Sequence, residues 1–293
     1  MNRSQSISEQ TVARGTRILS GLHRHLAAAA SPDDIDIPYN DLSGLVEMIE
    51  DDLVEVGSEV VSLAPCSEPE DYFYVRPMNI AAVSVWVARK AGLARRTTDI
   101  GLGALLCDIG FALIRESPIS DREMQRHPEY GLRILRLDSR FTAWSRAIVF
   151  QHHERHDGSG YPRKLQGEGI DPLSRIVSVA DTYCSLVSSG NPSGARLGSQ
   201  EAFEYVMSAA GFEFDHTTVL GVMQYVAPYP VGTVVRLNTG ETAVVTRVFK
   251  GLTTRPNVRV IADRNGREVC EADEMVLADS KNQTTLITEI CDL

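Results

Sequence analysis

The hydrophobic period of the chain changes once, near Pro228, and this change limits the fold more than any other feature of the sequence. Before Pro228, apolar residues recur at three- and four-residue steps, the pattern of amphipathic helices; one such run is Leu42, Leu45, Val46, Ile49, Leu53 and Val56. Beyond it, β-branched residues dominate three short runs, 233–237, 242–249 and 257–261, which turn signals separate. We therefore expect a mainly α-helical chain with a small C-terminal antiparallel β-barrel or sheet.

The same patterns divide the chain into three parts. We expect an N-terminal helical region over 1–70, a central helical domain over 71–227 and a β-module over 228–293. With 293 residues, of which 43% are hydrophobic, the chain can bury about three quarters of its unfolded surface. A mainly disordered state is therefore excluded.

The net charge of the chain limits the classes of molecule that it is expected to bind. It has 39 acidic and 29 basic residues and a formal net charge of −10, so it repels polyanions and is not expected to bind a nucleic-acid polymer. No apolar run reaches the roughly 18 to 20 residues of a membrane span, and the first residues lack the pattern of a signal peptide. We expect a cytoplasmic protein that has no membrane partner. Its five cysteines are scattered and odd in number, which favours reduced thiols.

The histidines are distributed unevenly. Four of the seven, His127, His152, His153 and His156, fall within one short stretch that also contains the sequence QHHERHDGSGYP. Imidazole and carboxylate groups together are typical ligands of zinc, iron or manganese. Adjacent residues in a helix project about 100° apart, so His152 and His153 can face one ion only if the fold brings them together. For His156, the alternative to a role as a metal ligand is a side chain that is simply exposed to solvent.

Two aspartates strengthen the metal hypothesis. Asp108 lies in the apolar run ALLCDIGFALI, and Asp181 follows Ile176, Val177, Val179 and Ala180. A carboxylate in such surroundings is costly to bury unless it is paired or bound to a cation. Together with His127 and the His152–His153 pair, these aspartates predict a buried cluster of convergent ligands.

The order of these residues resembles that of the HD-GYP domain, a branch of the HD phosphohydrolases. Members of that family are helical bacterial proteins that hydrolyse cyclic di-GMP with two or three metal ions, often iron or manganese. The resemblance covers most of the chain, including the lead-in at 72–79 and a β-module beginning at 230–235. The matching motifs are Asp108-Ile109-Gly110, His127-Pro128-x-x-Gly131, His152-His153-Glu154, Asp157-Gly158-x-Gly160-Tyr161-Pro162 and Ala180-Asp181-x-Tyr183.

The resemblance assigns roles to named residues. It makes 71–227 the HD-GYP domain and Asp108 the aspartate that bridges metals and is catalytic if the protein is active. The metal ligands that it implies are Asp108, His127, His152, His153 and Asp181, with Cys107 as an optional further ligand.

Three positions depart from the family pattern. Cys107 and Arg76 stand where the family has histidines, and Phe111 stands where it has a lysine. A thiolate can bind iron or zinc, but arginine stays protonated and has no lone pair to offer. We infer that one metal site is disabled and that one site, built from Asp108, His127, His152 and His153, survives instead of two or three. Each lost charge-stabilising group commonly costs about 10²- to 10³-fold in rate, so hydrolysis is expected to be impaired or lost.

The remaining expectations concern ligand binding. Two roles are open for Arg76: it could bind a phosphate group through two hydrogen bonds, or it could form an ion pair with Asp181 or Asp108. The resemblance places Gly160, Tyr161 and Pro162 beside the ligand and links this loop to contacts with diguanylate cyclase domains; the loop is equally suited to a tight turn. The residues expected to bind ligand are Arg76, Gly160, Tyr161, Pro162, Arg163 and Lys164.

Three functions remain open at this stage. The sequence favours a cyclic di-GMP signalling protein, or one for a related cyclic dinucleotide, that acts by ligand binding or protein interaction with little hydrolysis. The first alternative is an active phosphodiesterase with a reduced metal cluster, and the second is an interaction scaffold that binds no ligand.

Overall fold

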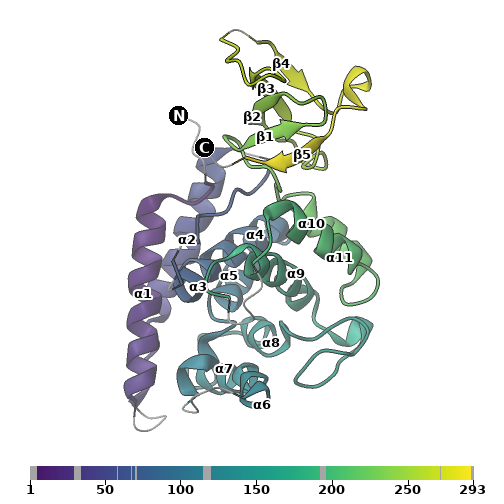
Figure 1. Ribbon diagram of the computed structural model, residues 1–293. Helices are drawn as coiled ribbons and strands as arrows, with labels where there is room; N and C mark the ends of the chain where they lie inside the picture. The colour runs from purple at the N-terminus through teal and green to yellow at the C-terminus, as the bar shows by residue number, and fades with distance from the viewer. Residues whose placement is uncertain are drawn as a thin grey trace.

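The computed structural model describes residues 5–29, 34–57, 59–66, 68–69, 71–114, 120–191, 196–270 and 272–291. Its helices precede its strands, so the expected mainly α-helical architecture with a C-terminal β-module is confirmed (Figure 1). The α-helices are α1 Glu9–Ala28, α2 Tyr39–Val56, α3 Asp71–Tyr74, α4 Arg76–Lys90, α5 Thr97–Leu105, α6 Asp121–Met124, α7 His127–Leu135, α8 Ala143–Gln151, α9 Pro172–Val187, α10 Ser199–Ser208 and α11 His216–Met223.

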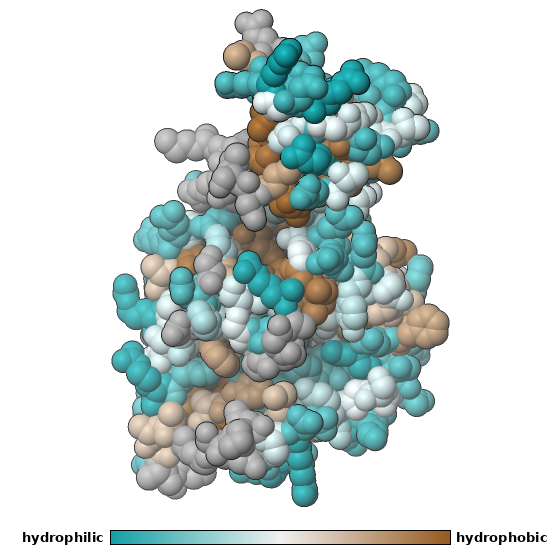
Figure 2. All heavy atoms as spheres, viewed as in Figure 1, coloured by the Kyte–Doolittle hydropathy of each residue, from teal (hydrophilic) through white to brown (hydrophobic). Residues whose placement is uncertain are grey.

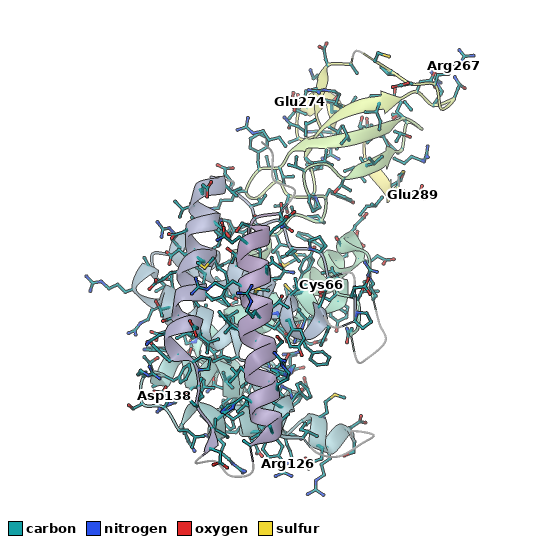
Figure 3. The ribbon with its side chains drawn as sticks, turned by 90° about the vertical axis from the view of Figure 1, so that its left-hand side faces the viewer. Cys66, Arg126, Asp138, Arg267, Glu274 and Glu289 are labelled. Carbon is teal, nitrogen blue, oxygen red and sulfur yellow. The ribbon has the colours of Figure 1, made fainter. Side chains whose placement is uncertain are left out.

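Helix α4 forms the centre of the helical body. Every residue from Arg76 to Ala88 is buried, since α4 packs against α2, α5 and α9 on different sides. A single hydrophobic core extends from Ile7 near α1 to Val226 after α11, so the N-terminal helices share their core with the central ones. Helices α1 and α2 stand side by side along one flank of this body (Figures 1 and 3).

A close backbone contact fixes α7 beside the short 3-10 helix η3, Ile109–Leu113. Gly110 lies so near that a Cβ atom added to it would stand 1.9 Å from the carbonyl oxygen of His127. Glycine is the residue that permits such an approach. The contact places Asp108, which immediately precedes η3, against the first residue of α7.

The β-module is an open antiparallel sheet. Its strands are β1 Val234–Leu237, β2 Thr242–Arg247, β3 Asn257–Ala262, β4 Glu274–Val276 and β5 Ile287–Ile290, in the order β4-β3-β2-β1-β5. β1 to β3 match the three expected runs. β4 and β5 were not expected, because they are short and mostly exposed and so lack a buried alternating pattern. Of the two expected alternatives, a barrel or a sheet, the described strands form the sheet.

A second, smaller core holds the sheet and continues into the helical body. Val235, Leu237 and Val258 pack with Tyr229, and Val60 from the segment after α2 joins them. Figure 2 shows hydrophobic residues gathered where the β-module meets the helices. The backbone N–H of Lys250 also donates to the Glu59 carboxylate, 3.2 Å away.

In Figure 3, Arg267 of the β-module and Arg126 beside α7 lie at opposite ends of the molecule. Within the described residues, no helix is both long and apolar enough to cross a membrane.

Candidate metal centre

Two histidine rings are each anchored by a backbone carbonyl. Nδ1 of His127 lies 2.6 Å from the carbonyl oxygen of Met124, and Nδ1 of His152 lies 2.9 Å from that of Val149. Because a carbonyl can only accept, both Nδ1 atoms carry the proton. In the neutral rings, each Nε2 atom therefore presents a lone pair.

These lone pairs face each other and a carboxylate. The Nε2 atoms of His127 and His152 lie 3.1 Å apart, and Oδ1 of Asp108 lies 3.2 Å from the first and 3.6 Å from the second. Burial, followed by the neighbouring His152, lowers the pKa of His127 to about 3. Burial also lowers the pKa of His152 to about 4. Both rings are therefore neutral near pH 7, and three acceptor atoms converge with no proton between them.

Such an arrangement fits a metal ion. A first-row divalent ion with ligands at about 2.1 Å holds neighbouring ligand atoms about 3.0 to 3.4 Å apart. His153 completes the group, because its ring nitrogen lies within 4.8 Å of the ligand atoms of Asp108, His127 and His152. Burial is the largest cause that lowers the pKa of His153, so this ring is also neutral. Metal ligands whose other ring nitrogen donates to a carbonyl are a recurring feature of metal sites.

Arg76 occupies the opposite side of the centre. Its guanidinium donates to Oδ2 of Asp108 and to Oδ1 of Asp181 through two different nitrogens. It also donates to the Ser185 hydroxyl at 3.0 Å and, through Nε, to the Tyr72 carbonyl at 3.3 Å. Only 1% of Arg76 is exposed. Burial is the largest single effect and lowers the pKa of Arg76, but the negative groups around it, Asp181 first, together outweigh burial and raise the net pKa. The group is a permanent buried cation.

A second cluster of ligand-type atoms surrounds this cation. Ligand atoms of Cys107, Asp108 and Asp181 all lie within 4.8 Å of one another. Burial and then the charge of Asp181 raise the pKa of the Cys107 thiol to about 12, so it is protonated in the metal-free protein. Asp181 therefore lies on the Arg76 side of the centre, and the three histidines lie on the other.

The side chain of Glu154 anchors the Gly-Tyr-Pro loop. The carboxylate of Glu154 is buried and accepts from the backbone N–H groups of Arg163 at 2.7 Å and Leu165 at 2.8 Å. Gly160 lies against backbone, since an added Cβ would stand 2.4 Å from the carbonyl oxygen of His153. The ring of Tyr161 stacks on that of His153 with centroids 4.7 Å apart. Glu154 thus braces the loop, and the loop places Tyr161 at the metal centre.

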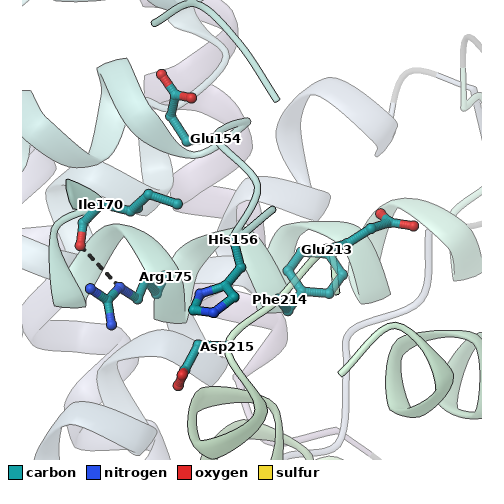
Figure 4. Close-up of a pocket in the computed structure, with 7 residues that line it drawn as sticks. All are labelled: Glu154, His156, Ile170, Arg175, Glu213, Phe214 and Asp215. Carbon is teal, nitrogen blue, oxygen red and sulfur yellow. Dashed lines mark hydrogen bonds between the residues drawn. The ribbon is translucent and has the colours of Figure 1, made fainter. Parts of the chain in front are cut away.

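The expected ligand-binding residues of this loop are divided by their exposure. Tyr161 and Pro162 are half-buried, and Tyr161 lies against His153, whereas the side chains of Arg163 and Lys164 are exposed. A small cavity on the other side of the loop is lined by Glu154, His156, Ile170, Arg175, Glu213, Phe214 and Asp215 (Figure 4). Its volume of ≈ 10 Å³ has room for about one water molecule. This cavity is too small for a nucleotide, and His156, which lines it, is not among the clustered ligand residues.

Phe111 covers the metal centre from the η3 side. Its ring stacks on that of His127, with centroids 4.2 Å apart and an interplanar angle of 17°. An apolar ring at this position shields the imidazole and brings no positive charge.

Two partners of Arg76 were not identified from the sequence. Ser185 follows Asp181 by four residues in α9, a spacing that places both on one helix face and could have revealed it. Tyr72 contributes its carbonyl and also its ring, whose centroid lies 4.3 Å from Cζ of Arg76. The sequence offers no comparable signal for Tyr72.

Comparison with known proteins identifies the fold and its lineage. A family model described as an HD domain matches residues 76–218, and one described as a KOW domain associated with HD domain matches 234–293. A cyclic di-GMP phosphodiesterase of Pseudomonas aeruginosa is 30% identical over 229 residues, which are 74% of this chain and 55% of that protein. Residues 76–218 belong to the HD domain family.

A second curated relative and a solved structure agree with this assignment. The cyclic di-GMP phosphodiesterase response regulator RpfG of Xanthomonas campestris is 34% identical over 140 residues, which cover 44% of this chain and 37% of that protein. The chain thus spans about half or less of the length of these two curated relatives. In a solved structure, an HD-GYP protein from Bdellovibrio bacteriovorus has a TM-score of 0.53 and 16% identity, covering 73% of this chain and 69% of the other; at that identity it supports the fold alone.

Proposed function

We propose that this chain binds a cyclic dinucleotide, cyclic di-GMP first of all, at a centre with one divalent metal ion, and that its hydrolytic activity is impaired or lost. The observation that carries the proposal is the convergence of three acceptors, Nε2 of His127, Nε2 of His152 and Oδ1 of Asp108, with no proton among them. A cation is the partner that such a group requires.

The donor set indicates the ion and its role. His127, His152, His153 and Asp108 would hold it, and a mixture of imidazole and carboxylate suits iron or manganese. The bound ion supplies positive charge for a phosphate group in a protein whose net charge is −10. Tyr161 lies at the same place, where its ring flanks His153 and can orient a ligand.

The side of the centre opposite the histidines argues against fast hydrolysis. Arg76 fills it with a cation whose hydrogen bonds go to Asp108, Asp181, Ser185 and Tyr72, so the guanidinium is engaged inside the protein. Phe111 brings no charge to the pocket. Each charge-stabilising group lost from a phosphoryl-transfer site costs about 10²- to 10³-fold in rate. Two such losses leave little turnover.

The names of the relatives support the class of ligand. Two of them are cyclic di-GMP phosphodiesterases, and a third, from Vibrio cholerae, is a 3'3'-cGAMP-specific phosphodiesterase that is 45% identical over 64 residues, 22% of this chain and 12% of that protein. Arg163 and Lys164 are exposed at the end of the Gly-Tyr-Pro loop and add local positive charge to this acidic protein. We further propose that this loop is the contact for a diguanylate cyclase domain and that the protein acts in the cytoplasm.

Equilibrium dialysis with cyclic di-GMP tests the proposal. The full chain, loaded anaerobically with Mn²⁺ or Fe²⁺, is expected to bind the dinucleotide saturably, to lose this binding when the metal is removed, and to release almost no linear dinucleotide or GMP by chromatography. His127→Ala should abolish binding, whereas His216→Ala, an exposed histidine in α11, should not change it. Rapid product formation would establish the phosphodiesterase alternative. If the metal-loaded protein neither binds the dinucleotide nor forms product, the interaction-scaffold alternative is favoured.

A further inference from the structure

The Arg76 side of the centre contains three residues whose ligand atoms could hold a metal ion. The Cys107 thiol and the carboxylates of Asp108 and Asp181 lie within 4.8 Å of one another. They come from two elements, the turn after α5 and helix α9, which the packing of the helical body holds together. A sulfur and two carboxylate oxygens suit a first-row divalent cation, and the sulfur favours thiophilic ions such as Zn²⁺ or Co²⁺.

A cation already occupies this place. Two nitrogens of the Arg76 guanidinium each bind one of the two carboxylates, and the group is almost completely buried. The ring of Tyr72 lies against it on one side, and Ser185 fixes one of the nitrogens. Arginine does not lose its proton, so the positive charge is permanent.

We propose that Arg76 is a built-in counter-cation that closes a second metal site, and that its removal opens a site for a thiophilic divalent ion on Cys107, Asp108 and Asp181. The inference rests on the proposed function, because the two sites share Asp108: Oδ1 faces His127 and His152, and Oδ2 binds Arg76. The wild-type chain therefore takes up one divalent ion. When an ion enters the opened site, the Cys107 thiol gives its proton to the solvent, a sulfur–metal bond forms, and no electron is transferred.

Titration of the metal-free full chain with Co²⁺ tests this inference, because cobalt bound to a thiolate has an intense near-ultraviolet charge-transfer band. The wild-type chain is expected to bind one equivalent without this band. Arg76→Ala is expected to bind two equivalents and to show the band, and Arg76→Ala/Cys107→Ser is expected to lose the band. Arg95→Ala removes an exposed arginine and should behave as the wild type does.

The outcomes separate the inference from the proposed function. A thiolate band in the wild-type chain, or a folded Arg76→Ala chain that binds one equivalent without the band, overturns the inference. If circular dichroism shows that Arg76→Ala is unfolded, Cys107→Ser in the wild-type background decides: an unchanged cobalt titration supports the inference, and a changed one overturns it. A wild-type chain that binds no cobalt contradicts the proposed metal centre alone, and a thiolate band in Arg76→Ala would still support the site described here.

Discussion

Asp108 divides its two carboxylate oxygens between a guanidinium and a pair of imidazoles. Oδ2 accepts from Arg76, whereas Oδ1 lies 3.2 Å from Nε2 of His127. The first contact pairs the carboxylate with a permanent positive charge, and the second leaves a lone pair directed at the histidine cluster. Asp108 therefore links the half of the centre that the Arg76 guanidinium fills to the half that the histidines form, where the metal ion is proposed to bind.

Arg76 is expected to stabilise the metal-free protein. Arg76→Met keeps most of the volume but leaves Asp108 and Asp181 without their buried partner, which should lower the free energy of unfolding by about 3 to 5 kcal/mol. Urea unfolding followed by circular dichroism measures the change. Arg95→Met, on the exposed surface, should stay within about 0.5 kcal/mol of the wild type. Equal stability of Arg76→Met and the wild type would show that the ion pairs add nothing to the fold.

His152 is expected to be essential for metal binding. His152→Ala removes one of the three converging acceptors, and because loss of an outer-shell partner alone costs about 10- to 100-fold in affinity, loss of a ligand should cost at least about 100-fold. Elemental analysis after anaerobic loading and gel filtration measures the bound metal. His216→Ala serves as the control. Metal content that survives His152→Ala would place the ion elsewhere.

Glu154 is expected to order the Gly-Tyr-Pro loop without binding metal. Glu154→Ala leaves the backbone N–H groups of Arg163 and Leu165 without their acceptor, so their amide hydrogens should exchange faster with solvent. Glu154→Gln keeps one oxygen acceptor and should protect one of the two amides. Hydrogen exchange with mass spectrometry measures both, and the metal content should be unchanged. Loss of metal in Glu154→Gln would assign this residue a role in the centre itself.

Gly110 is expected to tolerate no side chain. A Cβ atom at this position would meet the carbonyl oxygen of His127 at 1.9 Å, and because backbone cannot move aside as a flexible side chain can, Gly110→Ala should cost at least about 3 kcal/mol in stability. It should also weaken metal binding by displacing α7. Gly221→Ala in α11 meets nothing within 4 Å and should be neutral or stabilising by about 0.5 to 1 kcal/mol. Thermal unfolding of the two variants compares them directly.

Cys107 is expected to resist alkylation over the neutral and mildly alkaline range. Its pKa is raised to about 12, first by burial, so the thiolate forms only well above pH 9, and the side chain is fully buried. Iodoacetamide should label the exposed Cys270 quickly and Cys107 hardly at all, at both pH 7 and pH 9. Peptide mass spectrometry distinguishes the two sites. Rapid labelling of Cys107 at pH 7 would contradict a buried, protonated thiol.

Local sequence patterns were sufficient for the architecture. The three- and four-residue spacing of apolar side chains predicted the helical body, and the change near Pro228 predicted the β-module, since both periods depend on neighbours along the chain. The motif from His152 to Pro162 predicted the family in the same way. The assignment of Asp108, His127, His152 and His153 as ligands stays a prediction that metal analysis tests.

The tertiary structure decided how the side chains of the centre pair. From the sequence, Arg76 could bind a phosphate or an aspartate; in the folded chain it binds Asp181, which is 105 positions away, and Asp108 as well. Likewise, the protonation of His127 and His152 follows from the carbonyls that each ring meets. A residue type fixes which groups a side chain offers, but long-range packing determines which partner each group meets. By itself the sequence determined the helical body, the first three strands of the sheet and the ligand types, and only the packing of α4 against α5 and α9 decided that a guanidinium closes half of the centre.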